Sequence, residues 1–270
     1  MYLCPQILSQ SVMTILFPSP IFGPIRSRRL GISLGVNLIP ADGKLCTFDC
    51  LYCECGFNEG QRPHQPRPSR SQVKEALENQ LRKMVAEHAL PDVITFAGNG
   101  EPTAHPEFPA IIDDTLALRD AYCPKAKVAV LSNATMSHKP DVFEALLRVD
   151  DNIQKLDTVD TPYIQLVDRP VGRYEVSKVI DTLCAFKGKV IIQTMFMCGE
   201  THDGISVDNT GEHYVAAWLE AIKKISPSRV MVYTIDRETP EQGLLKASAQ
   251  VLDEIAERVR ALGLEASVSY

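Results

Sequence analysis

Cysteines gather in one short stretch near the start of the chain, and their spacing suits an iron–sulfur cluster. Cys46, Cys50 and Cys53 form a C-x3-C-x2-C pattern, and Cys55 follows two residues later. Thiolates are the usual protein ligands of such clusters. A tight loop lets three sulfurs reach three irons of a cubane [4Fe–4S] cluster. The fourth iron then has no protein ligand and is open to a small molecule.

Two other kinds of metal site compete with this interpretation. A structural zinc site needs four ligands, and Cys55 is available as the fourth. The spacing is not common for zinc, however, and no second C-x2-C pair follows. A closed electron-transfer cluster with Cys55 or a distant cysteine as its fourth ligand is the other alternative. We expect Cys55 to be a neighbour of the site, because it follows Cys53 too closely to reach the same open iron.

The cysteine motif resembles the defining motif of the radical S-adenosylmethionine (SAM) superfamily, in which an aromatic residue, here Tyr52, precedes the third cysteine. Residues 27–37, SRRLGISLGVN, are similar to the branch related to wyosine-base synthesis on transfer RNA. This resemblance covers most of the chain. It implies a [4Fe–4S] cluster on Cys46, Cys50 and Cys53, with SAM bound at the open iron beside Tyr52. It also implies a reduced electron donor such as flavodoxin or ferredoxin.

A glycine-rich stretch with a carboxylate, Gly98-Asn99-Gly100-Glu101, follows the next expected strand. Glycines let a backbone approach a ligand closely, and a carboxylate accepts hydrogen bonds from an ammonium group. In the superfamily, a Gly-Gly-Glu-Pro-like stretch at this position receives the methionyl amine of SAM. Asn99 departs from the two-glycine form, whereas Glu101 keeps the carboxylate. The alternative is an ordinary turn between a strand and a helix.

Polar residues also end the next two expected strands. The resemblance places Asn133 near the methionyl or ribose part of SAM, and the alternative is a turn or capping residue. Strand alternation puts Lys155 and Asp157 on the same face. Charged residues on a buried strand need partners or a ligand. We expect them to contact the carboxylate or ribose of SAM, or the substrate, unless they form an internal ion pair.

The elements that must position these residues alternate between strand-like and helix-like segments. Helices are expected from an N-cap at Ser71 and over residues 107–122, 141–148, 175–186, 212–225 and 248–262. Strands are expected over residues 30–39, 92–97, 127–132, 152–157, 189–197 and 229–235, with a short last one at 265–269. Several strand runs are apolar without alternation, which is typical of parallel strands buried on both faces.

This pattern predicts an α/β fold, a partial (β/α)6 TIM-like barrel of parallel strands with outer helices. A doubly wound open sheet is the alternative architecture. We expect an N-terminal extension over residues 1–21, of which 1–12 are dispensable because Met13 offers a second start. Residues 22–270 form the single predicted domain.

The composition is that of an ordinary globular protein, with 45% hydrophobic residues in a chain of 270. No apolar stretch is long enough to span a membrane, and no signal peptide is recognised, so a cytoplasmic location is expected. The net charge of −6 does not support a general nucleic-acid-binding surface. A local basic rim could still attract an acidic electron donor or a phosphate-bearing substrate, although these arginines could equally be solvated: Arg26, Arg28, Arg29, Arg62, Arg67 and Arg70.

The function expected from these observations is that of a radical SAM enzyme. Such an enzyme cleaves SAM reductively and uses the 5′-deoxyadenosyl radical to take hydrogen from a substrate. The alternatives are an enzyme acting on a modified nucleobase in RNA and a non-enzymatic iron–sulfur electron carrier. Asp168-Arg169-Pro170 also resembles a family stretch, which implies that it could face substrate; for Arg169 alone, the alternative is a surface arginine.

Overall fold

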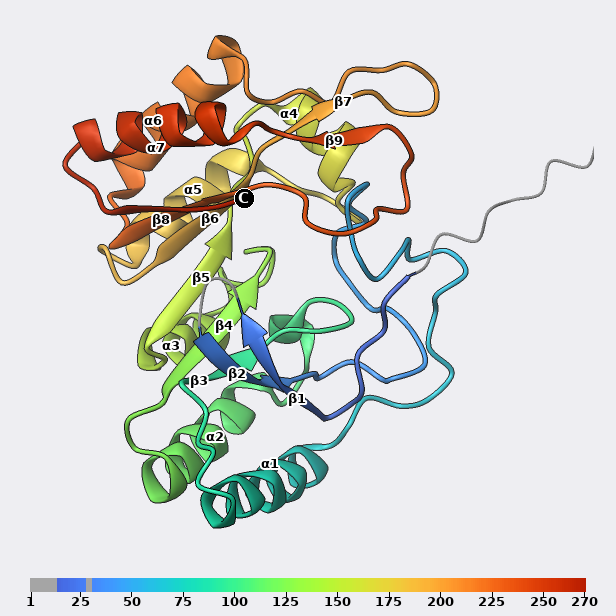
Figure 1. Ribbon diagram of the computed structural model, residues 1–270, viewed down its shortest axis with the longest axis vertical. Coiled ribbons are helices and arrows are strands. Elements are labelled where there is room, and N and C mark those ends of the chain that lie inside the picture. Colours follow the sequence, from blue (N-terminus) through green and yellow to red (C-terminus); the bar gives the residue numbers. More distant parts are fainter. Residues whose placement is uncertain (1–13, 28–30) are drawn as a thin grey trace, which may run out of the picture.

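The computed structural model describes residues 14–27 and 31–270 (Figure 1). Residues 1–12, which were expected to be dispensable, and Arg28 and Arg29 of the expected basic rim lie outside the described residues. Within the described part, no helix is long and apolar enough to cross a membrane.

One sheet of eight strands forms the centre of the fold, in the order β1-β2-β3-β4-β5-β6-β8-β10. All neighbouring strands are parallel except β1, which runs antiparallel to β2. The strands are β1 (Ile21–Ser27), β2 (Gly31–Val36), β3 (Val93–Phe96), β4 (Lys127–Ser132), β5 (Asp151–Lys155), β6 (Ile191–Met195), β8 (Arg229–Tyr233) and β10 (Ala266–Ser269).

Helices follow the parallel strands and cover the outer face of the sheet (Figure 1). They are α1 (Arg70–Ala86), α2 (Phe108–Tyr122), α3 (Pro140–Arg148), α5 (Val176–Ala185), α6 (Glu212–Ile225) and α7 (Ala249–Ala261). Between β5 and α5 lie a short helix α4 (Thr161–Tyr163) and a π-helical turn η2 (Ile164–Asp168). A short helical turn η1 (Pro102–Ala104) follows β3. The predicted partial barrel with outer helices is confirmed.

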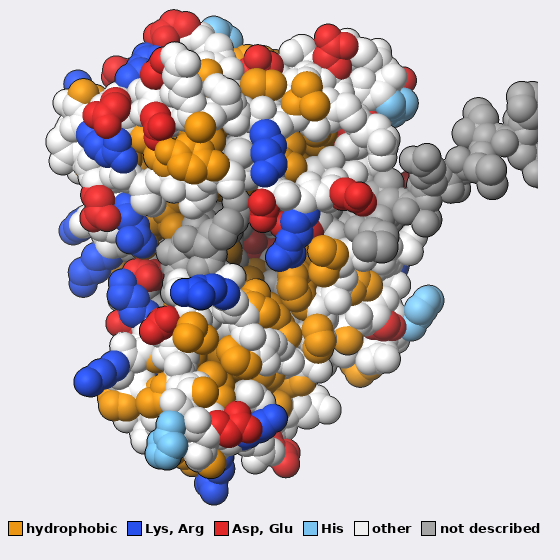
Figure 2. All heavy atoms as spheres, viewed as in Figure 1, with side chains coloured by type: hydrophobic (Ala, Val, Ile, Leu, Met, Phe, Trp, Pro, Cys, Tyr) orange, Lys and Arg blue, Asp and Glu red, His pale blue; other side chains and the backbone are white. Residues whose placement is uncertain are grey.

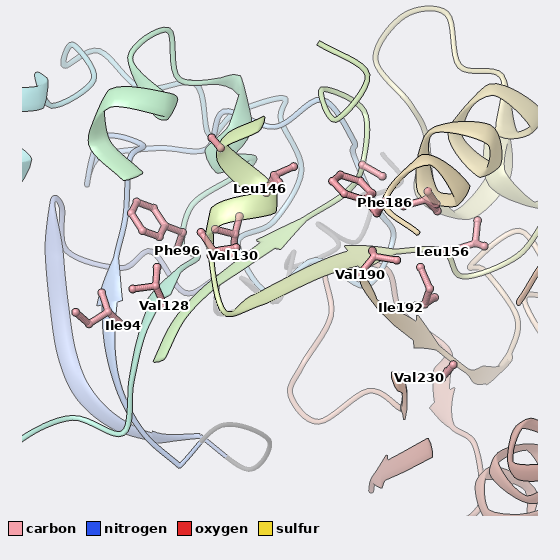
Figure 3. Close-up of a cluster of buried hydrophobic side chains, with 14 of the residues drawn as sticks. Ile94, Phe96, Val128, Val130, Leu146, Leu156, Phe186, Val190, Ile192 and Val230 are labelled. Carbon is pink, nitrogen blue, oxygen red and sulfur yellow. The ribbon is translucent and has the colours of Figure 1, made fainter. Parts of the chain in front are cut away.

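Alternate residues along each strand pack on opposite faces of the sheet. The main core lies between the sheet and the helices, where Ile94, Phe96, Val128 and Val130 meet residues such as Leu146 (Figure 3). The intervening residues form a second apolar cluster on the inner face of the curved sheet: Val93, Ala129, Ile153, Ile191 and Met231. Burial on both faces explains why these strands read as continuous apolar runs in the sequence.

The structure corrects several details of the sequence prediction. Helix α1 is capped by Ser69, not Ser71, because Ser69 and Gln72 complete a capping box at that position. The apolar periodicity that predicts this helix includes Val85, but Val85 lies in the last turn of α1 and is 41% exposed. Strand β1 begins at Ile21, the last residue of the predicted extension.

The short antiparallel pair β7 (Met197–Gly199) and β9 (Leu244–Lys246) was also not predicted. Its strands are only three residues long, which is too short for an alternating pattern to be visible in the sequence.

Candidate functional site

A cavity of about 190 Å³ lies at the carboxyl ends of the central strands. The predicted cluster ligands Cys46, Cys50 and Cys53 all line it, and so does Glu101. The other lining residues are Phe48, Tyr52, Gly100, Leu131, Ser132, Asn133, Ile153, Lys155 and Gln193. In parallel α/β barrels, ligands bind at this end of the strands. The structure therefore brings most of the sequence-predicted site residues into one place.

The cysteine loop is anchored beside Glu101 by backbone hydrogen bonds. The amide of Leu45 donates to the carbonyl of Asn99 at 3.0 Å, and the amide of Glu101 donates back to the carbonyl of Leu45 at 3.1 Å. Gly100 lies between these bonds, and a Cβ placed on it would lie 1.8 Å from the Leu45 carbonyl oxygen. Only glycine allows this approach, so the glycine predicted to bring backbone close to a ligand brings it close to the cysteine loop.

The three cavity cysteines differ in their electrostatic surroundings. Burial raises the pKa of Cys46 to about 12, and burial also raises the pKa of Cys50. The pKa of Cys53 is lowered to about 6, first by a hydrogen bond with Cys55 and then by the charge of Lys44. Cluster ligation requires thiolates, and burial disfavours the thiolate form of Cys46 and Cys50. The positive charge of bound iron would have to offset this cost.

Cys55 lies next to the cavity but is not among the residues that line it. Its thiol donates to the carbonyl of Gly98 at 3.6 Å and interacts with Cys53. This placement agrees with the expectation that Cys55 is a neighbour of the ligands and not a fourth ligand.

The carboxylate of Glu101 is fully enclosed and aimed by its neighbours. Its Oε2 accepts a hydrogen bond from the backbone amide of Asn133 at 2.7 Å, and its Oε1 accepts one from the amide of Thr103 at 3.1 Å. Burial raises the pKa of Glu101, and these hydrogen bonds oppose the rise. The carboxylate is thus held in one orientation at the cavity wall, as a receptor for an ammonium group requires.

Asn99 and Asn37 hold the N-terminal segment against the glycine-rich stretch. The side chain of Asn99 is bound to backbone atoms of Phe17 and Pro40, and it is fully buried. Asn37 donates to the carbonyls of Phe17 and Pro18. The Asn99 amide therefore points away from the cavity, so its side chain has a structural task. Gly98 is needed here because a Cβ would lie 2.6 Å from Asn37 Cγ.

Asn133 connects the end of β4 to the cysteine loop. Its Nδ2 donates to Thr47 Oγ1 at 2.8 Å and approaches Cys46 Sγ at 3.6 Å. Its Oδ1 accepts from both the amide and the hydroxyl of Thr135. Both the predicted placement at the site and the alternative of a turn residue are therefore seen in one side chain.

Lys155 and Asp157 form the ion pair that was the alternative to ligand contact, with 2.7 Å between Nζ and Oδ2. Tyr52 joins them, because its hydroxyl contacts both side chains. Asp157 Oδ1 also accepts from the amide of Met195 at 2.9 Å. Lys155 lines the cavity, whereas Asp157 lies behind it. The ion pair therefore contributes one charged side chain, Lys155, to the cavity wall, and Asp157 holds it in place.

Asp168 extends this network beneath the cysteine loop. Its Oδ1 accepts from the hydroxyl of Tyr52 at 3.1 Å and from the thiol of Cys50 at 3.7 Å. Burial raises the pKa of Asp168 to about 8. Arg169 is exposed, as in the alternative of a surface arginine, and lies over the ring of Phe57 with its guanidinium carbon 5.0 Å from the ring centre.

Sequence reasoning missed Lys44 and Asp49, which are part of the cysteine loop. Lys44 is buried beside Cys46 and Cys53, and its Nζ lies 3.1 Å from Asp49 Oδ1. Both residues lie within two positions of a cluster cysteine, which is the only signal that the sequence offered.

Gln193 supplies an unused acceptor in the cavity. Its Nε2 donates to the hydroxyl of Tyr233 at 3.1 Å, while its buried Oε1 has no partner among the described residues. With three thiols, an oriented carboxylate and a vacant acceptor on one cavity, the residues fit a three-thiolate cluster with a polar organic ligand beside it.

No three His, Cys, Asp or Glu side chains of the described ranges converge as they would on a single metal ion. A cubane spreads its thiolates over different irons, so this finding concerns single-ion sites such as zinc.

The expected basic rim is only partly free. Arg67 donates to the carbonyl of Ala104 at 3.0 Å, and Arg70 makes a two-pronged ion pair with Asp114. Arg26 and Arg62 are exposed. On the face shown in Figure 2, basic and acidic side chains are interspersed, and no patch of one sign dominates.

Comparison with protein families gives a match to the family model of the radical SAM superfamily over residues 42–209. A relative from Helicobacter pylori (strain ATCC 700392 / 26695), a UPF0026 protein, is 30% identical over 242 residues, which cover 86% of this chain and 73% of the relative.

Several solved structures share the fold at low sequence identity. A radical SAM methyltransferase from Sphaerobacter thermophilus has a TM-score of 0.64 at 14% identity, covering 88% of this chain and 66% of that one. Streptococcus suis SuiB, solved bound to S-adenosylmethionine, has a TM-score of 0.60 at 14% identity over 85% of this chain. The chain spans about half of SuiB, 49% of its length. Archaeal TYW1 has a TM-score of 0.52 at 12% identity, covering 85% and 71% of the two chains.

Proposed function

The chain belongs to the radical SAM superfamily and to the UPF0026 group of proteins, and we propose that it is an enzyme that cleaves SAM reductively. In this proposal Cys46, Cys50 and Cys53 hold a [4Fe–4S] cluster. When bound, the cluster and SAM supply one-electron chemistry that yields methionine and a 5′-deoxyadenosyl radical able to take hydrogen from a substrate. A reduced flavodoxin or ferredoxin would serve as electron donor.

The observation that carries the proposal is the shared cavity of the three cysteines and Glu101. A carrier that only passes electrons needs no oriented carboxylate next to its cluster. Glu101 has both oxygens fixed by backbone amides, which prepares it to accept hydrogen bonds from the amino group of SAM. Cys55, the nearest candidate for a fourth ligand, interacts with the Gly98 carbonyl, which leaves one iron open for SAM.

The remaining cavity residues would position SAM and exclude water. Lys155 offers a cation to the SAM carboxylate or to a ribose oxygen, and its charge is maintained because Asp157 lies behind it. Gln193 Oε1 can accept a hydrogen bond from a ribose hydroxyl or an adenine amino group. Leu131 and Ile153 form the apolar part of the wall, so a radical generated there is shielded from solvent.

Anaerobic reconstitution tests this proposal. The purified chain is loaded with iron and sulfide, reduced with dithionite and given SAM, and 5′-deoxyadenosine is measured by liquid chromatography. We expect 5′-deoxyadenosine from the parent protein and none from Cys50→Ala. The matched control is Cys123→Ala, which removes a buried cysteine that does not line the cavity.

Two further measurements separate an enzyme from an electron carrier. Cys55→Ala is expected to keep the iron content and the activity of the parent. The electron paramagnetic resonance spectrum of the reduced parent is expected to change when SAM is added. A loaded parent that makes no 5′-deoxyadenosine and has a spectrum indifferent to SAM contradicts the proposal.

A further inference from the structure

The amino group of Lys44 is enclosed within the cysteine loop, and its side chain is only 1% exposed. It donates to the carbonyl of Gly56 at 2.6 Å and to Asp49 Oδ1 at 3.1 Å. Gly56 follows the cysteine motif, Lys44 precedes it, and Asp49 lies inside it. One buried ammonium group therefore connects the start, the middle and the end of the loop.

The buried charge of Lys44 acts on two of the proposed cluster ligands. An ammonium group has three donors, and two of them are used by Gly56 and Asp49. The positive charge of Lys44 lowers the pKa of Cys53 and opposes the rise in the pKa of Cys46. Cys53 and Cys46 in turn contribute to raising the pKa of Lys44, against the effect of burial. The lysine is therefore a fixed cation at the cluster.

We propose that Lys44 is a positioning residue that raises the reduction potential of the cluster by fixing one buried positive charge inside the loop that carries the three cysteines. The inference rests on the proposed function, because it concerns the cluster held by the three cysteines. Hydrogen bonds to the ligand sulfurs and local charge are established determinants of iron–sulfur potentials. Reduction adds one negative charge, and a nearby cation stabilises the reduced state.

Asp49 places a negative charge next to Lys44 in the cysteine loop. It is the only residue whose carboxylate pairs with Lys44 among the ion pairs of the described chain, and its side chain is 15% exposed. Arg169 lies 3.9 Å from the other oxygen of Asp49. Glu54, also in the loop, is already paired with Arg237 at 2.6 Å. Removing Lys44 or Asp49 therefore changes the local charge in opposite directions while breaking the same ion pair.

The test is a redox titration of the loaded protein followed by electron paramagnetic resonance, with iron content and circular dichroism measured on each sample. The variants are Lys44→Gln and Asp49→Asn. The matched control is Lys74→Gln, because Lys74 also pairs with an aspartate but is half exposed on α1. At the midpoint potential of the parent, we expect the ratio of reduced to oxidised cluster to fall about tenfold in Lys44→Gln. For a one-electron couple this corresponds to about 59 mV.

The expected pattern has opposite signs for the two loop variants. Asp49→Asn raises the reduced fraction, and Lys74→Gln leaves it unchanged. A purely structural role predicts that both loop variants lose iron without opposite shifts in potential, and that result overturns the inference. So does a loaded Lys44→Gln protein with the midpoint of the parent. If Lys44→Gln fails to take up a cluster, Asp49→Asn decides alone: a raised potential supports the inference, and an unchanged one overturns it.

The two proposals fail in different ways. A parent protein that takes up no cluster, or makes no 5′-deoxyadenosine, contradicts the proposed function. A parent that is loaded and active, with variants that do not shift the potential, contradicts only the role of Lys44.

Discussion

Asn99 and Phe17 are joined by a pair of hydrogen bonds across 82 positions of sequence: the Phe17 amide donates to Asn99 Oδ1 at 2.7 Å, and Asn99 Nδ2 donates to the Phe17 carbonyl at 2.9 Å. An amide side chain thus pairs with an extended backbone as a neighbouring strand would. The stretch that follows β3 is thereby fixed by the segment that precedes β1. This contact makes residues 14–20 part of the site's support.

Asn99→Ala is therefore expected to destabilise the protein. The change leaves the Phe17 amide without its partner and removes the hydrogen bonds that Asn99 donates to the carbonyls of Phe17 and Pro40, although Asn37 still donates to Phe17. We expect this to cost roughly 2–4 kcal/mol in the free energy of unfolding. Urea unfolding followed by the fluorescence of the single tryptophan, the buried Trp218, measures the loss. Asn79→Ala, at an exposed position of α1, should stay within about 0.5 kcal/mol of the parent. Equal urea midpoints for both variants would show that the Phe17 contact contributes nothing.

Glu101→Gln should reduce both stability and SAM binding. Each carboxylate oxygen accepts a backbone N–H, so the glutamine NH2 must face a donor from Asn133 or Thr103 in either orientation. That mismatch costs about 1–3 kcal/mol. Loss of the charge should weaken SAM binding about tenfold, equivalent to about 1.4 kcal/mol.

Calorimetry with the cluster-loaded protein checks the effect on affinity. Glu75→Gln, on the exposed side of α1, is the control with the same chemical change. If folded Glu101→Gln bound SAM as tightly as Glu75→Gln, the carboxylate would have no part in receiving the ligand.

Gly100→Ala should prevent the cysteine loop from closing. The added methyl would lie 1.8 Å from the carbonyl oxygen of Leu45, so the two hydrogen bonds around Leu45 must break. We expect a lower unfolding midpoint and less than half of the parent's iron after reconstitution. Gly211→Ala is the control, because a Cβ there meets nothing within 4 Å. Full iron content in Gly100→Ala would show that the loop tolerates displacement.

A pH effect is expected at the contact between His202 and Glu241. The hydrogen bond with Glu241, 2.9 Å from Nδ1, raises the pKa of His202 above its ordinary value of 6.5, with the charges of Asp203 and Glu241 contributing. The protonated form is favoured in the folded state. Its contribution to stability is therefore fully present below pH 6.5 and is lost as the pH rises through the raised pKa.

Nuclear magnetic resonance titration of the His202 ring measures this shift. In Glu241→Gln the pKa of His202 should fall back toward 6.5, while Glu257→Gln, a change in an ion pair of α7, should leave it in place. A His202 titration that is identical in the parent and in Glu241→Gln would refute the assignment of the cause.

The barrel strands and most of the helices could be predicted because their signals are local. β4 and α6 occur at the expected residues, since apolar runs and helical periodicity are visible within each segment. β1 was missed because antiparallel pairing with β2 depends on contacts that no local pattern records.

The sequence predicted most of the residues that line the candidate cavity, but not the residues that support it. Cys46, Cys50 and Cys53 are recognisable by spacing alone. The tasks of Lys44 and Asn99 are not, because each is defined by partners that only the folded loop brings near. A buried lysine and a backbone-binding asparagine look in the sequence like ordinary polar loop residues.

The cysteine loop packs against segments that follow it far along the sequence. Phe48 and Leu51 belong to an apolar cluster with Met195, Tyr233 and Ile235, and the carbonyl of Leu51 accepts a hydrogen bond from the amide of Glu241. On the ribosome, the cysteines emerge long before these residues exist. The pocket that shields the thiols therefore forms only after residues 195–241 have been made, and delivery of iron and sulfide should follow the synthesis of that segment.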